Sequence, residues 1–555
     1  MAQEQVTQEQ LTTAERIDGE YDYVITGAGS AGCLLANRLS ADPDKRVLIL
    51  EAGGNDNWIW FHIPVGYLFA IGNPRSDWCF KTEPEPGLNG RSLNYPRGKV
   101  IGGSSAINAM VYMRGQAADY DHWRQLGLNG WGWDDVLPYF KRHENHFMGE
   151  SAVHAIGGEW HIEAPRVRWD LLDAFRDAAE QAGIKSIADF NCGDNEGCCA
   201  FHVNQRRGRR VSAARAFLKP VLNRANLRLE TGCLVEGIVF DDKRAAGVRW
   251  KQNGQTRMAR CRGEVILAAG SIGSTQILLL SGVGPAAHLQ EHGIPVVLDR
   301  PGVGANLQDH LQLRMIYKVD GIPTLNERYH APLGFARMFA EYALFRRGPL
   351  TMAPSQLGLF TRSDSDQDRA NLQYHVQPLS LDKFGDPLHK FPAFTASVCN
   401  LRPTSRGMVR LRSANASDPP AIKPNYLSTD DDRRIAARAI RLTRRIASQP
   451  ALAPFHPAEY LPGAAVPDDD EQALIKAAGD IGTTIFHPVG TAKMGLPSDS
   501  MMVVDKRLRV AGLERLRIID ASVMPSITSG NTNAPTMMIA EKGAAMLRED
   551  AKVLA

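Results

Sequence analysis

YDYVITGAGSAGCLLANRLSADPDKRVLILEAGG, residues 21–54, has the layout of a dinucleotide-binding unit. Residues 23–25 are apolar and predict a strand, GAGSAG at 27–32 predicts a tight turn, and the leucines of residues 31–40 predict a helix with one buried face. The apolar run at 47–50 is typical of a parallel strand buried on both sides. In such a turn the first glycine permits the bend, the second lets a pyrophosphate approach, and the third lets the helix pack on the strand.

An acidic residue ends the second predicted strand. Glu51 follows Gly32 by 19 positions, close to the spacing of an acid that binds a ribose hydroxyl. An acid at the ribose disfavours a 2′-phosphate, and with it NADP. NAD and FAD both stay open from this segment alone.

The composition is that of a globular protein with more than one core. At 555 residues, of which 44% are hydrophobic and 23% charged, the chain predicts two intimately joined domains. A net charge of +3 predicts no general affinity for nucleic acid or acidic lipid. Residues 1–20 predict a disordered or frayed tail. With no secretory signal and no apolar stretch long enough to span a bilayer, the sequence favours the cytoplasm, and peripheral association with a membrane stays open.

Eight cysteines are scattered along the chain, which is typical of a reduced compartment and offers no disulfide framework. The segment NCGDNEGCC (191–199) holds three of them. It lacks a second ligand pair at the spacing of a zinc site. The sequence therefore predicts a loop with partly buried thiols and no metal.

One helical segment has an ambiguous apolar pattern. Residues 335–360, FARMFAEYALFRRGPLTMAPSQLGLF, are rich in aromatic side chains, and the helical pattern ends at Gly348-Pro349. A buried core helix is the favoured interpretation. A lid over a pocket and a membrane-contacting face are the alternatives.

Later segments identify a family. They are RGKVIGGSSAINAMVYMRG (97–115), GSIGSTQILLLSGVG (270–284), FHPVGTAKMG (486–495) and IIDASVMPSITSGNTNAPTMMIAEK (518–542). Together with the first turn, they resemble the signatures of the glucose–methanol–choline (GMC) family of flavoenzymes, and the resemblance runs over about residues 21–548.

The resemblance implies an α/β fold of two interwoven domains. One is a Rossmann-like FAD-binding domain, expected over 21–155, 216–315 and 485–555. The other is an α+β substrate-binding domain, an antiparallel sheet flanked by helices, expected over 156–215 and 316–484.

The same resemblance implies that the dinucleotide is FAD. Some members attach it covalently through a histidine two residues beyond the Ser-Ser pair; Ile107 stands there, which implies non-covalent binding. The residues expected to contact FAD are Gly27, Gly29, Ser30, Ala31, Gly32, Glu51, Ala52, Gly103, Ser104, Asn108, Ala109, Val111, Val235, Asp520, Ala521, Asn531 and Thr532.

Two residues are expected to carry the chemistry, the oxidation of a primary alcohol to the aldehyde. His487 in FHPVG matches the family's base for the hydroxyl, and Asn531 in GNTNAP matches the position that hydrogen-bonds the substrate oxygen. Such a pair is needed because a proton leaves the oxygen while a hydride leaves the carbon for flavin N5. Asn533 is expected to have a structural or flavin-contact role.

The sequence identifies the substrate and the electron acceptor less closely than it identifies the cofactor and the reaction. Choline-oxidising relatives carry a glutamate just before a Gly-x-Phe; Gln356 stands there in SQLGLF, which removes one anchor for a trimethylammonium group. We therefore expect an uncharged primary alcohol, aliphatic or aromatic, in a substrate pocket that includes Gln356 and Phe486, with choline as the alternative. Overall resemblance favours a quinone-type acceptor over O2, the oxidase alternative that would produce H2O2.

Three rival functions differ in what they leave unexplained. An NAD-dependent dehydrogenase does not account for the later signatures. A lyase with structural FAD, such as a hydroxynitrile lyase, would retain His487 but would not reduce its flavin with alcohols. A non-enzymatic binding protein has no need of His487 or Asn531. The sequence does not give the oligomeric state.

Overall fold

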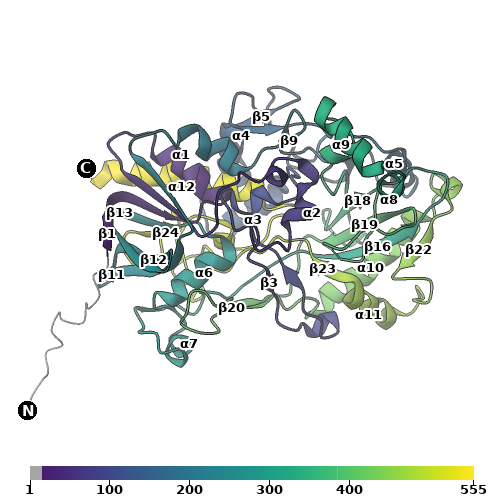
Figure 1. The fold of residues 1–555 in the computed structure, drawn as a ribbon. Coiled ribbons are helices and arrows are strands. Elements are labelled where there is room, and N and C mark those ends of the chain that lie inside the picture. The colour runs from purple at the N-terminus through teal and green to yellow at the C-terminus, as the bar shows by residue number, and fades with distance from the viewer. Residues whose placement is uncertain (1–15, 384, 555) are drawn as a thin grey trace, which may run out of the picture.

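The glycine-turn segment forms the centre of a seven-stranded sheet in the computed structural model, which describes residues 16–383 and 385–554 (Figure 1). Its strands are β1 (Arg16–Thr26), β2 (Val47–Glu51), β10 (Leu227–Thr231), β11 (Leu234–Asp241), β12 (Arg244–Gln252), β13 (Gln255–Leu267) and β24 (Leu516–Ile518). The order is β10-β2-β1-β13-β12-β11, and β24 pairs with β13. β1 pairs in parallel with both β2 and β13, so the turn after β1 lies at the middle of the sheet edge.

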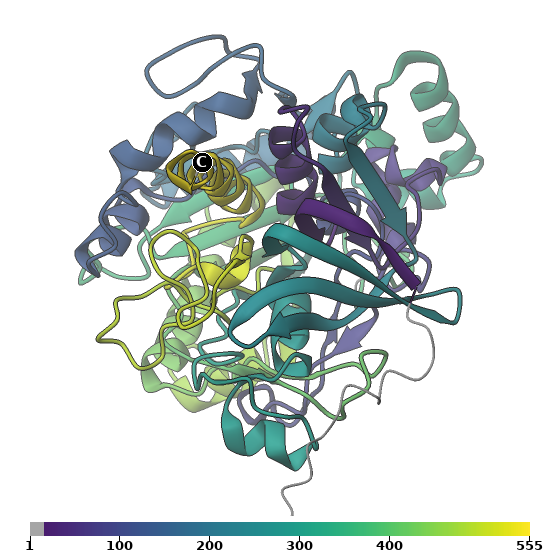
Figure 2. The ribbon, with the colours of Figure 1, turned by 90° about the vertical axis from the view of Figure 1, so that its left-hand side faces the viewer.

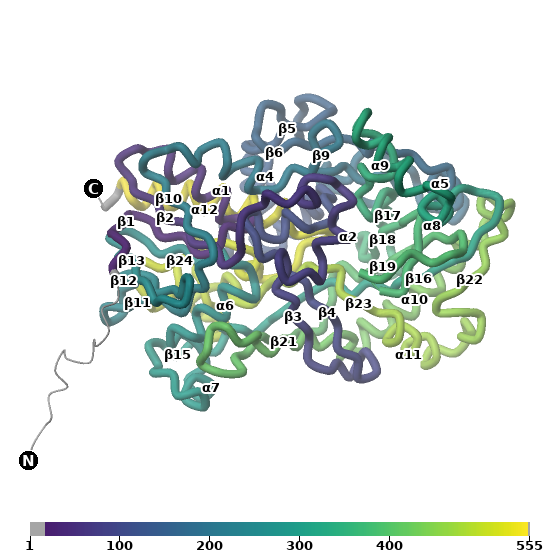
Figure 3. The backbone as a smooth tube through the Cα atoms, viewed as in Figure 1, coloured from purple at the N-terminus to yellow at the C-terminus, as the bar shows by residue number. Residues whose placement is uncertain are grey.

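The two ends of the chain meet on this sheet. α1 (Ser30–Leu39) begins directly after the glycine turn and packs beside α12 (Asn533–Leu554), the last helix. Figure 3 shows the purple N-terminal and yellow C-terminal segments side by side. All of β2 is buried, as expected for a parallel strand covered on both faces.

The predicted frayed tail is wrong over residues 16–20. This stretch is the first part of β1, where Arg16 pairs with Arg257 and Glu20 with Arg260 of β13. Arg257 also lies 3.3 Å from the carboxylate of Asp18. Ladder hydrogen bonds and charge pairs hold this polar stretch, so an apolar pattern is a poor guide to it. Residues 1–15 of the predicted tail lie outside the described residues.

A second seven-stranded sheet is antiparallel throughout. Its strands are β7 (Gly197–Ala200), β16 (Leu311–Lys318), β17 (Leu357–Thr361), β18 (Leu372–Gln377), β19 (Ala393–Asn400), β22 (Ala458–Leu461) and β23 (Gly482–Thr484). The order is β22-β16-β19-β18-β17-β7, and β23 pairs with β16. α10 (Asp430–Ala447) packs on β19, with α5 (Asp170–Gln181) and α11 (Glu471–Ile481) beside it.

Short elements connect and flank the two sheets. The helices are α2 (Tyr67–Ala70), α3 (Ala117–Gln125), α4 (Trp133–His143), α6 (Gly270–Leu280), α7 (Ala286–Glu291), α8 (Leu325–His330) and α9 (Gly334–Phe345). The two-stranded ribbons pair β3 (Phe80–Lys81) with β4 (Asn94–Tyr95), β5 (Glu144–His146) with β6 (Trp160–Ile162), β8 (Gln205–Arg206) with β9 (Arg209–Arg210), β14 (Val283–Gly284) with β15 (Leu298–Asp299), and β20 (Met408–Arg410) with β21 (Ala421–Lys423).

The predicted fold class is confirmed: a mixed, mainly parallel sheet and an antiparallel sheet built by one interwoven chain. The chain starts in the first sheet, adds β7 to the second, returns for β10 to β13, completes the second and ends in the first. β16 begins at Leu311, so the second sheet starts inside the segment 216–315 assigned to the FAD-binding domain. The exact division into domain segments stays a prediction.

The helix within residues 335–360 is not a buried core helix. α9 buries Gly334, Met338 and Tyr342, a single stripe at a spacing of four, and its other residues are exposed. Apolar residues on every side of a helix predict burial only when other elements cover them, and the sequence does not show that cover. None of the helices in the described ranges is long and apolar enough to cross a bilayer.

Candidate active site between the two sheets

A large cavity is walled by both sheets. The first sheet contributes the turn after β1, the end of β2 and the start of β11, and the second contributes Gln312 of β16 with His375 and Gln377 of β18. Because the lining runs from the glycine turn of one sheet to the strands of the other, the cavity suits an elongated ligand that reaches from one sheet to the other.

Two glycine loops make its narrow end. A Cβ atom on Gly103 would lie 2.7 Å from the Cα of Gly29, and one on Gly32 would lie 1.9 Å from the carbonyl oxygen of Gly27. Gly29 itself has no atom closer than 3.9 Å to such a Cβ position. The loops are thus in contact with each other, while open space remains over Gly29 at the N-terminus of α1, where backbone N–H groups and the helix dipole favour an anion.

Glu51 joins the second strand to the glycine turn. Its carboxylate accepts hydrogen bonds from the backbone N–H of Ala28 and of Gly53, both at 2.8 Å. Burial raises the pKa of Glu51 to about 7, against the lowering effect of these two bonds. The side chain also lines the cavity, as a ribose-binding acid must.

Nearly all of the predicted contact residues line this one cavity. Gly32 does not, because it packs against the strand instead. The predicted residues that line it are Gly27, Gly29, Ser30, Ala31, Glu51, Ala52, Gly103, Ser104, Asn108, Ala109, Val111, Val235, Asp520, Ala521, Phe486, His487, Asn531 and Thr532. Ile107 and Asn533 line it as well, and Ser30 Oγ donates to Asn533 Oδ1 at 2.7 Å.

The structure brings His487 and Asn531 together. The Nδ2 atom of Asn531 lies 3.0 Å from Nε2 of His487, and Gln373 Nε2 donates to Asn531 Oδ1 at 3.3 Å. Both side chains are buried and line the cavity. The two residues are 44 positions apart in sequence, so their pairing is a property of the fold.

Neighbouring groups determine which nitrogen of His487 carries its proton. Nε2 of His310 lies 3.0 Å from the carbonyl oxygen of Leu401, which can only accept, so this nitrogen bears a hydrogen. Burial lowers the pKa of His310 to about 4, so the ring is neutral and its Nδ1 accepts. That Nδ1 lies 3.1 Å from Nδ1 of His487, which must therefore donate. The lone pair of His487 is then on Nε2, the atom that faces Asn531 and the cavity.

His487 is held as an uncharged ring. Burial lowers its pKa well below the ordinary value of 6.5, and the nearby His310, His375 and Arg97 lower it further. His375 lies on β18 and lines the same cavity, neither of its ring nitrogens has a hydrogen-bond partner, and burial lowers its pKa to about 3. A neutral imidazole whose lone pair is on the nitrogen that faces the cavity is the form that can accept a proton.

A buried carboxylate fixes the backbone at His487. Asp309 accepts from the backbone N–H of His487 at 2.7 Å through one oxygen. Its other oxygen accepts from the hydroxyls of Tyr95, Tyr426 and Thr484, at 2.9, 2.5 and 2.6 Å. The negative charge is therefore bonded to the main chain and to hydroxyls, and to neither nitrogen of the imidazole.

The residue before His487 adopts a costly conformation. Phe486 has a φ of 71°, in the left-handed region that side chains other than glycine rarely enter. Its N–H donates to Thr484 Oγ1 at 2.8 Å, and its carbonyl accepts from Arg97 at 2.7 Å. Such strain persists where the surroundings hold it, and here the turn aims the imidazole into the cavity.

Four aromatic side chains line the cavity: Tyr67, Trp78, Phe80 and Phe486. Gln356, predicted for this pocket, does not line it: its Nε2 donates to the carbonyl of Ala353 at 3.0 Å. The backbone at Gln356 already bonds Val376 and Phe201 of neighbouring segments, so the side chain turns away, and the preceding Pro354 and Ser355 line the cavity in its place.

A second polar cluster lies away from the cavity and contains Cys192 of NCGDNEGCC. His154 Nε2 and Cys192 Sγ lie 2.8 and 3.1 Å from the same oxygen of Asp189, and His154 Nδ1 lies 3.2 Å from Glu144. Glu144 also accepts from Arg114 at 2.6 Å. The sequence spacing did not reveal that these groups meet, and their atoms are close enough to hold a metal ion.

The groups of this cluster form hydrogen bonds and ion pairs with one another. Despite burial, hydrogen bonds from His154 and the charge of Arg114 lower the pKa of Glu144 to about 2, and the bonds from His154 and Cys192 lower the pKa of Asp189. The two carboxylates raise the pKa of His154 against the effect of burial. Two carboxylates therefore face the cations Arg114 and His154, which gives a buried ion-paired network.

Comparison with known proteins gives one consistent result. The family models for the N-terminal and C-terminal parts of GMC oxidoreductases match residues 21–312 and 403–540. An alcohol dehydrogenase (acceptor) of Pseudomonas putida is 42% identical over 531 residues, which cover 95% of each chain. An oxygen-dependent choline dehydrogenase of Brucella anthropi is 43% identical over 524 residues, 94% of each chain. The crystal structure of pyridoxine 4-oxidase from Mesorbium loti has a TM-score of 0.86 at 32% identity and covers 95% of this chain and 99% of its own.

Asp189→Asn is expected to destabilise the protein, because it removes a buried carboxylate that hydrogen-bonds His154 and favours its charged form. Breaking a buried pair from one side costs about 3–5 kcal/mol. The raised pKa of His154 contributes stability below its ordinary value of 6.5, and that contribution is lost as the pH rises through its folded value. The fall in the thermal midpoint should therefore be large at and below neutral pH and smaller at alkaline pH.

The matched control is Asp194→Asn, in the same loop but exposed. Its thermal midpoint should stay close to that of the wild type, since exposed substitutions change stability by about 0.5 kcal/mol or less. Equal midpoints for the two variants at every pH would contradict the ion-paired network.

Proposed function

The chain belongs to the GMC oxidoreductase family, and from that premise we propose that it binds FAD and oxidises an uncharged primary alcohol to the aldehyde. The observation that carries the proposal is the pairing of His487 Nε2 with Asn531 Nδ2, at 3.0 Å, on the wall of a cavity whose narrow end is a dinucleotide-type glycine turn. A binding protein of this fold would need neither side chain.

The chain's residues fit the cofactor. The space over Gly29 and the N-terminus of α1 suits the pyrophosphate, Glu51 suits the adenosine ribose, and Ser104 and Asn108 line the way toward His487. Ile107, where a covalent attachment would need a nucleophile, supports dissociable FAD. When bound, FAD supplies the hydride acceptor.

The protein's own contribution is to hold and deprotonate the hydroxyl. A hydroxyl placed between His487 and Asn531 donates its hydrogen to Nε2 of His487 and accepts a hydrogen bond from Nδ2 of Asn531. The proton of the alcohol passes to Nε2, and Nδ1–H of His487 stays bonded to His310. Asn531 supports the negative charge that develops on the oxygen. The aromatic side chains of the lining offer apolar surface to the carbon chain of the substrate.

The charges along the cavity support an uncharged substrate. Among the lining residues of the described chain, the carboxylates are Glu51 and Asp520. Glu51 is bonded to the glycine turn, and Asp520 accepts from Gly270 N–H and Ser274 Oγ near the start of α6. Both carboxylates are thus already bonded to the main chain or to a hydroxyl, so a trimethylammonium group meets aromatic side chains of this lining without an unengaged counter-charge.

Choline is the second candidate, since a relative at 43% identity is an oxygen-dependent choline dehydrogenase. For the acceptor we propose a quinone-type molecule, on the likeness to the acceptor-dependent alcohol dehydrogenase of Pseudomonas putida. O2 is the alternative.

The deciding test is anaerobic. Purified protein is mixed with 1-alkanols, benzylic alcohols and choline, and flavin absorbance is followed. Loss of the flavin bands with the uncharged alcohols and not with choline is expected; strong bleaching by choline overturns the substrate proposal, and no bleaching by any alcohol overturns the reaction. Admission of air then separates an oxidase from a dehydrogenase.

Two variants connect the reaction to its residues. His487→Ala should lower kcat by about 10²–10⁴-fold, the range for losing a general base, with FAD still bound. Asn531→Ala should cost about 10–100-fold, since it removes one hydrogen bond to a developing charge. His330→Ala, an exposed histidine, serves as the control. Unchanged single-turnover rates in His487→Ala would exclude it as the base.

His310 is expected to act as a positioning residue. His310→Leu leaves Nδ1–H of His487 without an acceptor, a loss of about 1–3 kcal/mol that lowers kcat/KM by about 5–150-fold. His310→Gln, whose amide can both accept from His487 and donate to Leu401, should recover most of the rate.

In the wild type, kcat/KM should stay level as the pH falls through 6.5, the ordinary imidazole value, because His487 is still neutral there. A limb at 6.5, or equal rates in the two variants, would contradict this arrangement.

The glycine turn gives a paired test of cofactor binding. Gly29→Ala has room within the protein, so the thermal midpoint of the apoprotein should be unchanged, but its methyl group stands where the pyrophosphate approaches. We expect its affinity for FAD to fall by about 10-fold or more, or ~1.4 kcal/mol. Gly32→Ala collides with the carbonyl of Gly27 and should lower the apoprotein midpoint itself. Flavin fluorescence and thermal melts separate the two effects; full FAD affinity in Gly29→Ala would contradict the assignment.

A further inference from the structure

The outer side of α9 is an exposed apolar face. Leu333, Leu344 and Phe345 are 72%, 74% and 63% exposed, and Phe335 and Phe339 lie in the open beside them. These five residues are called the α9 face below. The intervening Ala336, Ala340 and Ala343 are exposed as well. Large apolar side chains gathered on one helix mark a contact surface, whereas single ones scattered over a protein do not.

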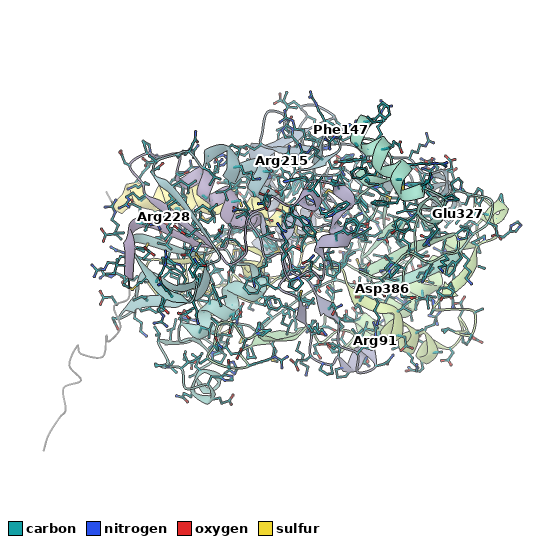
Figure 4. The ribbon with its side chains drawn as sticks, in the orientation of Figure 1. Arg91, Phe147, Arg215, Arg228, Glu327 and Asp386 are labelled. Atoms are coloured by element: carbon teal, nitrogen blue, oxygen red, sulfur yellow. The ribbon has the colours of Figure 1, made fainter. Side chains whose placement is uncertain are left out.

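A second exposed apolar group projects from the same edge of the molecule. Phe147, Met148 and Ile156 lie in the loop that joins β5 to β6 and are largely exposed. In Figure 4 Phe147 projects near α9 at the top of the molecule, whereas in Figure 2, turned by 90°, the loop and α9 rise at opposite ends of the top edge. The two apolar groups are therefore separate from each other, and both rise from the top side of the protein.

Arginines surround the α9 face. The β8–β9 hairpin packs beneath the helix, where Tyr342 Oη donates to the carbonyl of Gly208 at 3.1 Å, and Arg166 Nε donates to the carbonyl of Arg346 at 3.0 Å. Six arginines stand on α9, directly after it, or on the segments that contact it: Arg166, Arg206, Arg207, Arg337, Arg346 and Arg347, called the arginine collar below. α8, which packs on α9, adds Arg328 and Glu327. The other acids here are Glu163 and Glu341, so the cations outnumber the carboxylates and the rim is positive.

We propose that this side of the protein docks on an anionic lipid bilayer, with α9 lying in the headgroup region. An apolar helix face with arginines around it is the arrangement that interfacial helices use, because the side chains enter the acyl boundary while the cations meet acidic headgroups. A second protein copy would not account for the collar, since two such faces would place their arginines against each other.

The overall charge of the chain does not argue against this surface. A net charge of +3 is spread over 555 residues, but an electrostatic contact is made within about a Debye length, ~8–10 Å in physiological salt. Over that range the collar, and not the remainder of the protein, faces the lipid. The expectation of no affinity for acidic lipid, taken from net charge alone, therefore does not apply to this side.

The docked side is connected to the cavity. α9 is followed by the turn η7 (Pro349–Thr351), and Pro354 and Ser355, three residues later, line the cavity. If the chain passes electrons to a lipid-soluble quinone, as proposed above, docking would bring the bilayer in which such a quinone dissolves close to the segment that leads from α9 to the cavity. The docking itself does not depend on this, and the two ideas fail in different experiments.

The test uses the FAD-loaded protein and vesicle flotation. Vesicles of phosphatidylcholine mixed with phosphatidylglycerol should carry the wild type, pure phosphatidylcholine vesicles should carry little, and added salt should weaken the binding. Leu344→Glu and Phe345→Glu should each reduce the partition coefficient by about 10-fold or more. Both residues are exposed, so FAD content and the thermal midpoint should stay as in the wild type.

Met408→Glu is the matched control, an exposed apolar residue on β20 at the opposite edge of the molecule, and it should bind like the wild type (Figure 1). Absence of wild-type binding to the anionic vesicles, or equal binding by Leu344→Glu and Met408→Glu, overturns the proposal. So does a dimer in light scattering that the α9 variants convert to a monomer while vesicle binding is unchanged, because a second copy would then cover the face.

Discussion

The site depends on one buried ring that no charge stabilises. His487 bonds two neutral groups, His310 through Nδ1 and Asn531 through Nε2, and burial keeps its pKa well below the ordinary value. A carboxylate on either nitrogen would hold the ring as an imidazolium near neutral pH. The proton would then already occupy the atom that must receive it. Keeping the charge away from the ring is therefore the condition for this imidazole to act as a base.

Asp309 shows how the fold meets that condition. The turn at Phe486 needs a strong acceptor for the N–H of His487, and a carboxylate is the strongest available. The hydroxyls of Tyr95, Tyr426 and Thr484 all donate to the second oxygen of Asp309. The carboxylate therefore has its hydrogen-bond donors and does not bond the imidazole of His487. The same network holds a strained backbone and leaves the base neutral, so its geometry and its proton affinity have a common cause.

Sequence patterns predicted the parts of the site that lie within continuous segments. The glycine turn, Glu51, His487 and Asn531 each stand in a local motif, and each lines the cavity. Asp309 and His310 stand directly before β16, and His375 stands inside β18. A polar residue has no distinctive sequence neighbours there, and only the meeting of the two sheets gives these three a role. Gln356 failed as a pocket residue for a related reason. Its backbone pairs with Val376 and Phe201, and its side chain bonds the carbonyl of Ala353.

The same limit explains α9 and residues 16–20. The periodicity of a sequence shows which side of a helix or strand is apolar. Whether that side is buried depends on whether another element packs against it, and the pattern does not show this. At β1 the covering strand β13 exists, and a polar stretch is ordered by it; at α9 no element covers Leu344, and an apolar stretch faces solvent. An uncovered apolar face is costly in water, and with an arginine collar around it the physical solution that fits is an acidic lipid surface. The exposure that makes α9 a poor core helix is thus what suits it to contact a membrane.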